Sequence, residues 1–241
     1  MKINRSTKLI LDIVMGAVIP IVILNQLTAP LGAPTAYVLS ALVPVAWIFI
    51  DLLFITRRFN FITAYIGLTA IVRGALAFWF VDGALFAFKD TAPLLVAFAI
   101  FAYTLVRGRP VMYYFASQAF NADTPQREAA LNRLLDAPRI RRPLVLGTLV
   151  LTLSNLLAAV ANYILNLRMV VAPFGTDTFN FQVAEVNAIT RVAFTVPEMI
   201  LFMVAFFMVY RALFQNLPET EFGSDDFWRA VENRGAPEVS G

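Results

Sequence analysis

The longest uncharged stretch of this chain is the feature that most restricts its fold. From Ile13 to Ile50 there is no Asp, Glu, Lys or Arg. A helix needs only about twenty apolar residues to cross a bilayer, so this stretch has room for two spans and a turn. Over the whole chain 59% of the residues are hydrophobic and 15% are charged, whereas about a quarter are charged in an average soluble domain. The sequence therefore predicts an all-α, polytopic membrane protein.

Apolar length, read against charged residues and against Pro and Gly, divides the chain into about six expected spans. They cover residues 9–27, 34–56, 60–81, 90–107, 143–166 and 188–213. We expect the first to be an uncleaved span rather than a signal peptide, because it reaches Leu27 and contains Asp12. The expected domains are a six-span transmembrane domain over residues 1–214 and a flexible, acidic cytoplasmic tail over residues 215–241.

The basic residues predict the orientation of these spans. With six spans the connections alternate between the two sides of the membrane, and fifteen of the 19 Lys and Arg residues fall on one side. These fifteen are Lys2, Arg5, Lys8, Arg57, Arg58, Arg107, Arg109, Arg127, Arg133, Arg139, Arg141, Arg142, Arg211, Arg229 and Arg234. Only Lys89, Arg168 and Arg191 fall on the other side. Because basic residues are retained in the cytoplasm, both termini are expected there.

The longest cytoplasmic connection begins with residues too apolar and aromatic for a solvated loop. Pro110 suits a first helical position, so a helix lying at the membrane interface is expected to follow it. A second short helix is expected after Thr124, which places cytoplasmic interfacial helices at 110–140. The basic residues that close this segment are expected to meet lipid headgroups, either as topology anchors or in specific lipid recognition. They are Arg139, Arg141 and Arg142.

The acidic tail contains one hint of local structure. Ser224 can cap a short helix that brings Phe227, Trp228 and Val231 together, as if to dock on a partner or on the chain itself. Flexibility is nevertheless the expectation for this segment, because its other residues are mostly polar and charged.

The absence of Cys and His narrows the possible chemistry. Neither residue occurs, so the chain has no thiolate nucleophile or metal ligand and no imidazole for metal binding or proton transfer. The sequence also lacks a Gly-rich phosphate loop, an Asp-rich metal motif and a nucleophile elbow. We therefore expect no enzyme activity, no catalytic residue, no cofactor and no metal. The basic residues are explained by membrane orientation, so no nucleic-acid partner is expected.

Two charged residues lie deep within the expected spans. A charge at the bilayer centre costs about 2.5–3.5 kcal/mol on insertion scales, so Arg73 and Glu198 require an explanation. At about 1.5 Å per residue, both lie roughly 15–20 Å from the cytoplasmic edge, which permits an ion pair. Such a pair either fastens two helices or supplies a gating or solute-binding charge.

Polar residues repeat along one face of the fifth expected span. Their spacing alternates between four and three residues once Ala159 is included, which places them on one side of a helix. They are Thr148, Thr152, Asn155, Asn162 and Asn166. Amides cannot face hydrocarbon cheaply, so this bundle-facing stripe is expected to be interhelical hydrogen-bond glue or the wall of a polar cavity.

A second polar region is expected near the cytoplasmic edge. Asp12 and Asp51 lie roughly 5–10 Å inside that edge, and Arg107 and Arg109 are on the same side. These four residues form either ordinary interfacial ion pairs or a cytoplasmic vestibule. Two further polar faces accompany them, Pro44, Trp47 and Asp51 on the second span and Arg191, Thr195 and Glu198 on the sixth.

Several short motifs resemble a known family. They are Lys8-Leu9-Ile10-Leu11-Asp12, Asn25, Arg107-Gly108-Arg109-Pro110, Tyr113, Asn155 and Ala161-Asn162-Tyr163. Over roughly residues 8–166 the chain resembles the intracellular septation protein A family and its uncharacterised multi-span bacterial relatives. The resemblance implies a bacterial inner-membrane protein associated with cell-envelope maintenance and division, with no established reaction. Septation proteins are shorter and typically have five spans, so the sixth span and the acidic tail have no counterpart in them.

Together these features predict a non-catalytic multi-pass protein of the bacterial inner membrane, acting through contacts with lipids, with other membrane proteins or with further copies of itself. The alternative is a small-solute or lipid transporter with a polar pocket inside the bundle. A membrane enzyme acting on lipids has only scattered carboxylates to support it. A polar cavity that reaches Arg73 favours the transporter, whereas a packed bundle with an apolar outer groove favours the contact protein.

Overall fold

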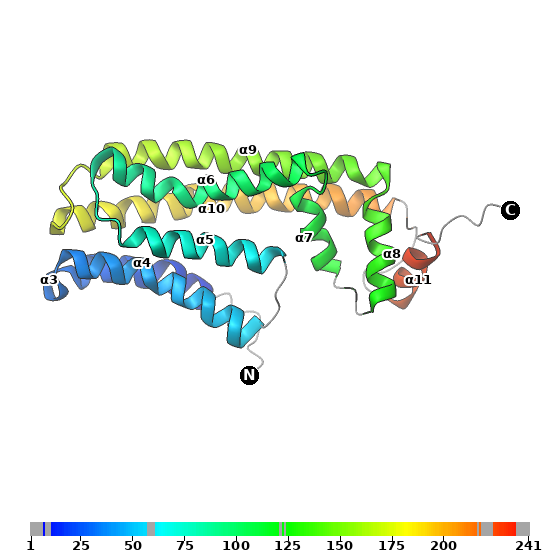
Figure 1. The fold of residues 1–241 in the computed structure, drawn as a ribbon, viewed down its shortest axis with the longest axis horizontal. Coiled ribbons are helices and arrows are strands. Elements are labelled where there is room, and N and C mark those ends of the chain that lie inside the picture. Colours follow the sequence, from blue (N-terminus) through cyan, green and yellow to red (C-terminus); the bar gives the residue numbers. More distant parts are fainter. Residues whose placement is uncertain are drawn as a thin grey trace. The chain divides into compact units, whose positions relative to one another are not determined.

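The structure of the chain, a computed structural model, is helical throughout the part that it describes (Figure 1). That part comprises residues 7, 11–56, 61–120, 122, 124–215, 217 and 224–234. It contains four helices long and apolar enough to cross a membrane, Ala33–Ile55, Gly83–Val106, Pro138–Met169 and Asp177–Phe214. The prediction of an all-α fold is therefore confirmed for these residues, and the four long apolar helices are compatible with a membrane protein. Several residues used above lie outside the described part, namely Lys2, Arg5, Lys8, Leu9, Ile10, Arg57, Arg58 and the tail segments 218–223 and 235–241.

Contacts within the structure divide the chain into two compact units. Unit 1 contains Met1–Phe98 and Asn155–Pro197, and unit 2 contains Ala99–Ser154 and Glu198–Gly241. This differs from the single membrane domain expected over residues 1–214. The reason is that three long helices, α6 (Gly83–Val106), α9 (Pro138–Met169) and α10 (Asp177–Phe214), each contribute one part to each unit. Hydropathy records where a helix is apolar but not which neighbours its two halves have.

The long helices also begin earlier than hydropathy predicts. Helix α9 has 32 residues and α10 has 38, which corresponds to about 48 and 57 Å, more than the roughly 30 Å of a hydrocarbon core. The predicted fourth, fifth and sixth spans start at residues 90, 143 and 188. The corresponding helices α6, α9 and α10 start earlier, at Gly83, Pro138 and Asp177. The expected loop between Arg168 and Asn187 is accordingly helical from Asp177 onward. A helix continues past the apolar region because its backbone hydrogen bonds do not depend on the surrounding solvent.

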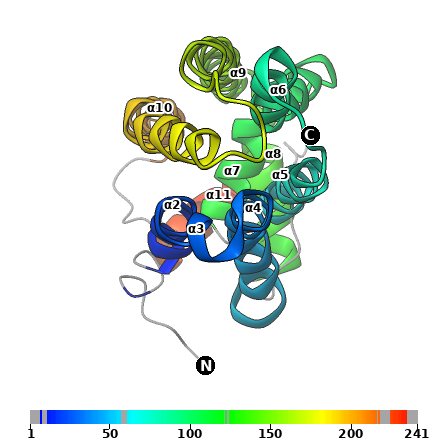
Figure 2. The same ribbon diagram turned by 90° about the vertical axis from the view of Figure 1, so that its left-hand side faces the viewer.

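Unit 1 is built mainly from the first half of the chain. Its elements are η1 (Val14–Val18), α2 (Ile19–Gln26), α3 (Thr28–Leu31), α4 (Ala33–Ile50), η2 (Asp51–Thr56), α5 (Phe61–Ala77) and parts of α6, α9 and α10. Figure 2 shows α2 and α4 side by side, joined through the short turn of α3. The elements η1 and η2 are π-helical, and such wider turns often occur at functional sites.

An aromatic core closes one end of unit 1. The Tyr37 ring meets the rings of Phe86, Phe174 and Phe179, with centroids 6.3, 5.6 and 5.9 Å away. Next to this core the buried Asn180 side chain donates from Nδ2 to the Thr28 hydroxyl and to the Ala33 carbonyl, both at 2.9 Å. These bonds tie α10 to the turn between α2 and α4, and they satisfy polar groups where the helical ladder is interrupted.

In unit 2, small residues let the helices approach closely. A Cβ placed on Gly147 of α9 would stand 3.1 Å from Ala205 Cβ and 3.1 Å from Met112 Cγ. This is tighter than nine in ten real contacts, so glycine at this position allows the close packing of α9 against α10 and against α7 (Val111–Phe120). The expected segment 110–140 contains α7 and α8 (Pro125–Leu135), with the Thr124 hydroxyl accepting from the Arg127 backbone N–H at 3.2 Å.

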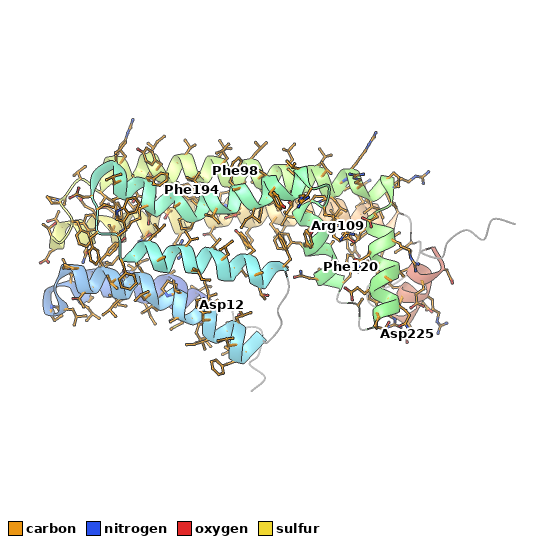
Figure 3. All side chains as sticks on the ribbon, in the orientation of Figure 1. Asp12, Phe98, Arg109, Phe120, Phe194 and Asp225 are labelled. Carbon is orange, nitrogen blue, oxygen red and sulfur yellow. The ribbon has the colours of Figure 1, made fainter. Side chains whose placement is uncertain are left out.

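The tail contains α11 (Asp225–Arg234), which differs from the expectation of a flexible segment. Phe227, Trp228 and Val231 are buried, and Arg127 of α8 forms a 3.0 Å ion pair with Asp225. Helices α8 and α11 pack against each other in Figure 1, and Phe120 and Asp225, labelled in Figure 3, belong to the short helices of unit 2. The apolar face of α11 is stabilised by this docking, which the polar composition of the tail conceals.

Candidate functional site

A pocket of about 360 Å³ lies within unit 1 and combines apolar walls with four charged side chains. It is formed by η1 and the residues before it, by α4 and η2, by α5 and by Arg191 of α10. The lining residues that matter for its chemistry are Asp12, Gly16, Trp47, Asp51, Thr69, Arg73 and Arg191. Pro44 also lines the pocket, so one wall of the pocket is formed where α4 lacks a backbone donor.

The charges are separated along the length of the pocket. On α5 the lining extends from Thr63 to Arg73, ten residues or about 15 Å along the helix axis. Asp51 directly follows the C-terminal end of α4, and Thr63 lies near the start of α5, the next α-helix. Pro44 lies about two turns before Asp51. The acids therefore occupy one end of the pocket and Arg73 the other.

Two hydrogen bonds hold charged lining residues in position. The Trp47 indole N–H of α4 donates to Asp12 Oδ1 at 2.8 Å, and Asp12 is labelled in Figure 3. The guanidinium of Arg191 donates from Nη2 to the Gly16 carbonyl at 2.6 Å. Gly16 lies in the π-helical turn η1, where the usual i to i−4 ladder is interrupted and a carbonyl can accept from another helix. The absence of a side chain at Gly16 leaves that carbonyl accessible.

Arg73 is the deepest charge of the pocket according to the predicted topology. It forms no hydrogen bond or ion pair with the described residues of unit 1, and its side chain is exposed to the pocket. Its expected partner Glu198 belongs to unit 2, so the Arg73 and Glu198 pair stays a prediction. Since Arg73 and Arg191 line the same cavity, the pocket presents two guanidinium groups to whatever occupies it.

The outer part of the predicted stripe is engaged in a closed hydrogen-bond network. Asn162 Nδ2 donates to Asp90 Oδ2 at 3.1 Å and to the Thr91 hydroxyl at 3.2 Å. Asn166 Nδ2 donates to the same Asp90 oxygen at 2.9 Å and to the Asn162 carbonyl at 3.0 Å. These bonds join α9 to α6 within unit 1, so here the amides act between helices rather than on a cavity.

The rest of the stripe has a different use. Thr148 and Thr152 are buried in unit 2, where the Thr148 hydroxyl accepts from the Met112 backbone N–H at 3.0 Å. That N–H belongs to the first turn of α7 and has no partner within its own helix, so Thr148 satisfies it. Asn155 is buried in unit 1. The five residues share one helix face as predicted, but they contact different elements.

The structure assigns the members of the predicted vestibule to different units. Asp12 and Asp51 line the pocket in unit 1, whereas Arg107 and Arg109 belong to unit 2. Arg107 Nε donates to the Tyr103 hydroxyl at 2.7 Å, and this bond raises the pKa of Arg107. The Arg109 guanidinium lies 5.5 Å from the Tyr113 ring centroid. Burial, followed by the charge of Asp136, raises the pKa of Tyr113, while Arg109 acts in the opposite direction.

Three polar residues of unit 1 were not predicted as site residues. Arg191 replaces the expected vestibule arginines in the pocket, and Asp90 is the acceptor that the amide stripe needs. Lys89 is buried and donates from Nζ to the Trp79 carbonyl at 2.6 Å, with the Tyr37 ring centroid 4.6 Å away. Asp90 was detectable, because it and Asn166 both lie at the outer ends of their expected spans. Arg191 was placed on a polar face of the sixth span and counted for topology, but it was not assigned to a site.

These features define a class of all-helical protein with membrane-length apolar helices and a charged pocket. Comparisons with protein-family models, with curated proteins and with solved structures found no match for the chain. The pocket is therefore the feature of the chain that bears on its function.

Proposed function

We propose that the chain is a six-span protein of the bacterial inner membrane, with both termini in the cytoplasm, that binds and transports a small solute carrying an anionic group. The observation that supports this proposal is a pocket between membrane helices that reaches Arg73. Its volume of about 360 Å³ falls within the roughly 300–1,000 Å³ typical of small-ligand sites. The role in envelope maintenance implied by the resemblance is the second candidate, in which the protein acts through contacts alone.

The charge of Arg73 supports an anionic ligand. An arginine within a membrane span is costly unless it is paired or solvated, and Arg73 has no hydrogen-bond or ion-pair partner among the described residues of unit 1. A carboxylate, phosphate or sulfonate can accept a bidentate pair of hydrogen bonds from a guanidinium. Arg191, held by the Gly16 carbonyl, adds a second positive charge to the same cavity.

The six-span topology rests on two shorter helices. Leu11–Gln26 and Phe61–Ala77 are apolar, and they join the four longer helices to make six. A helix of 17 residues extends about 26 Å, slightly less than a hydrocarbon core, and such a helix crosses the bilayer by local thinning or with help from flanking residues. Single Cys residues test the topology because the chain has none. Gly32→Cys and Thr176→Cys should react with an impermeant reagent in intact cells, and Ala129→Cys should not.

The pocket itself is tested by the charge preference of a thiol introduced at Thr69. In membrane vesicles, Thr69→Cys is treated with an anionic sulfonatoethyl or a cationic trimethylammonium-ethyl methanethiosulfonate, applied from each side in turn. Because Thr69 lies one helical turn from Arg73, the anionic reagent should react faster relative to its reactivity with a free thiol. Adding Arg73→Gln should lower that preference severalfold.

A matched control lies two residues along the same helix. Ile71 is 54% exposed in the protein alone but does not line the pocket, so it is expected to face lipid. Ile71→Cys should react with neither charged reagent. If Thr69→Cys is as unreactive as Ile71→Cys from both sides, the pocket is closed to solutes and the contact protein becomes the better explanation.

A further inference from the structure

Three guanidinium groups surround the turn between α6 and α7 in unit 2. Arg107 and Arg109 flank Gly108, whose φ of +76° gives the tight turn its left-handed conformation. Arg141 of α9 reaches back over the same turn, because its Nη2 lies 3.5 Å from the position of a Cβ on Gly108. Arg141 thus lies beside the turn that Arg107 and Arg109 flank, and the guanidinium groups of these two residues contact Tyr103 and Tyr113.

No carboxylate of the described residues neutralises this cluster. Among the described residues of unit 2 the ion pairs are those of Arg127 and Arg229, and the cluster arginines and Arg142 take part in none. Arg141 and Arg142 also lie in the first turns of α9, where the helix dipole disfavours positive charge. Like charges held together at an unfavourable helix end indicate that an anion from outside the chain completes the cluster.

The surface next to the cluster is apolar in the pattern of a lipid-facing helix. Arg142, Leu146, Leu149 and Leu153 recur at steps of four, three and four, so they share one face of α9. Leu146 is 50% exposed, Leu149 42% and Leu153 50%. A ligand whose anionic head contacts the arginines thus meets about 10 Å of exposed leucine surface along α9, from Leu146 to Leu153.

We infer that the cluster of Arg107, Arg109 and Arg141, together with Arg142 next to it on α9, binds an anionic diacyl phospholipid. The phosphate accepts hydrogen bonds from the guanidinium groups around Gly108, and an acyl chain lies along Leu146, Leu149 and Leu153. The continuity of the charged cluster with an apolar stripe favours a phospholipid over a free phosphate, which would leave the stripe without a role. This inference does not depend on the pocket of unit 1.

Native mass spectrometry of the full chain tests the inference. Protein purified with an equal mixture of phosphatidylglycerol and phosphatidylcholine should retain the anionic lipid selectively. Arg141→Lys combined with Arg142→Lys keeps both charges, and therefore the topology signal, but removes the bidentate donors. This variant should lose about tenfold in the ratio of anionic to zwitterionic lipid retained. Millimolar inorganic phosphate should not displace the lipid from the wild-type protein.

Two controls make the result decisive. Arg168→Lys changes the opposite end of the same helix and should leave the lipid ratio unchanged. Thermal unfolding of each variant in detergent verifies that the protein is folded before its lipids are counted. An unchanged lipid ratio in the double Lys variant, an equal loss in Arg168→Lys, or displacement by phosphate alone would each overturn the inference.

Discussion

Two polar regions of unit 1 differ in how their side chains are satisfied: one is a hydrogen-bonded network and the other is an open pocket. Around Asp90, the Nδ2 groups of Asn162 and Asn166 donate to acceptors on α6 or α9. Both asparagine side chains are buried. Around Arg73, the charged groups surround a cavity, and the guanidinium of Arg73 has no hydrogen-bond partner among the residues of the unit that the structure describes. Polarity within a membrane span is therefore not itself a sign of a site. What distinguishes a site is a polar group that the protein leaves for a ligand.

The difference also has an energetic side. A closed network contributes to stability, because in hydrocarbon an amide without a partner loses the hydrogen bond it would have had with water. An open pocket contributes little to stability, because solvent or a ligand satisfies its charges. Mutations in the two regions should therefore separate loss of stability from loss of binding.

The largest effect is expected from Asp90→Leu. The change removes the acceptor shared by Asn162 and Asn166, and each orphaned amide should cost about 1–3 kcal/mol in the free energy of unfolding. Asp90→Asn keeps one acceptor oxygen of similar shape and should cost less. Thermal and denaturant unfolding in detergent measure both. Equal stability of Asp90→Leu and the wild type would show that the network is not structural.

A smaller loss is expected when one donor is removed at a time. Asn162→Leu and Asn166→Leu should each lower the free energy of unfolding by about 0.5–2 kcal/mol, whatever solute is present. Combining Asn166→Leu with Asp90→Leu should cost less than the sum of the two single changes, because the residues share a hydrogen bond. Strict additivity in this double-mutant cycle would argue against the network. Asn155→Leu, buried in the same unit, extends the comparison to a third amide.

Trp47→Phe tests how firmly the pocket wall is held. It keeps an aromatic ring in α4 but removes the N–H that donates to Asp12 at 2.8 Å. Because Asp12 is only half-buried, we expect a loss of about 0.5–1.5 kcal/mol. The rate at which Thr69→Cys reacts with charged thiol reagents should change as well. A stability loss without any change in labelling would separate this bond from the pocket.

The smallest effect on stability is expected from Arg73→Gln. Because Arg73 has no hydrogen-bond or ion-pair partner among the described residues of unit 1, this change should alter the free energy of unfolding by less than about 0.5 kcal/mol while abolishing the preference for anionic reagents. An ion pair with Glu198 predicts instead a loss of about 3–5 kcal/mol, partly recovered when Glu198→Leu is combined with Arg73→Leu. The two outcomes decide between an open charge and a structural pair.

The sequence on its own predicted the helical, membrane-type fold, since long apolar segments have few other stable conformations. It also predicted which face of α9 is polar, because the helical repeat fixes the direction of side chains. Helix ends were less predictable, as the early starts of α6, α9 and α10 show, because a helix can extend beyond its apolar part. The tail helix α11 was only the alternative to a flexible tail in the sequence, because its stability comes from packing on α8 rather than from its own composition.

Only the tertiary structure decided which polar residues meet. Asp12 and Asp51 share a pocket with Arg73 and Arg191, which the sequence did not indicate, whereas their predicted association with Arg107 and Arg109 of unit 2 stays a prediction. The sequence left open whether Asn162 and Asn166 line a cavity or form hydrogen bonds between helices. In the structure both donate hydrogen bonds to Asp90 of α6. Periodicity fixes the face on which a side chain lies, but the element that faces it depends on contacts between segments far apart in the chain. Asp12 and Arg191 line the same pocket although most of the sequence lies between them, so no local pattern could predict that they share it.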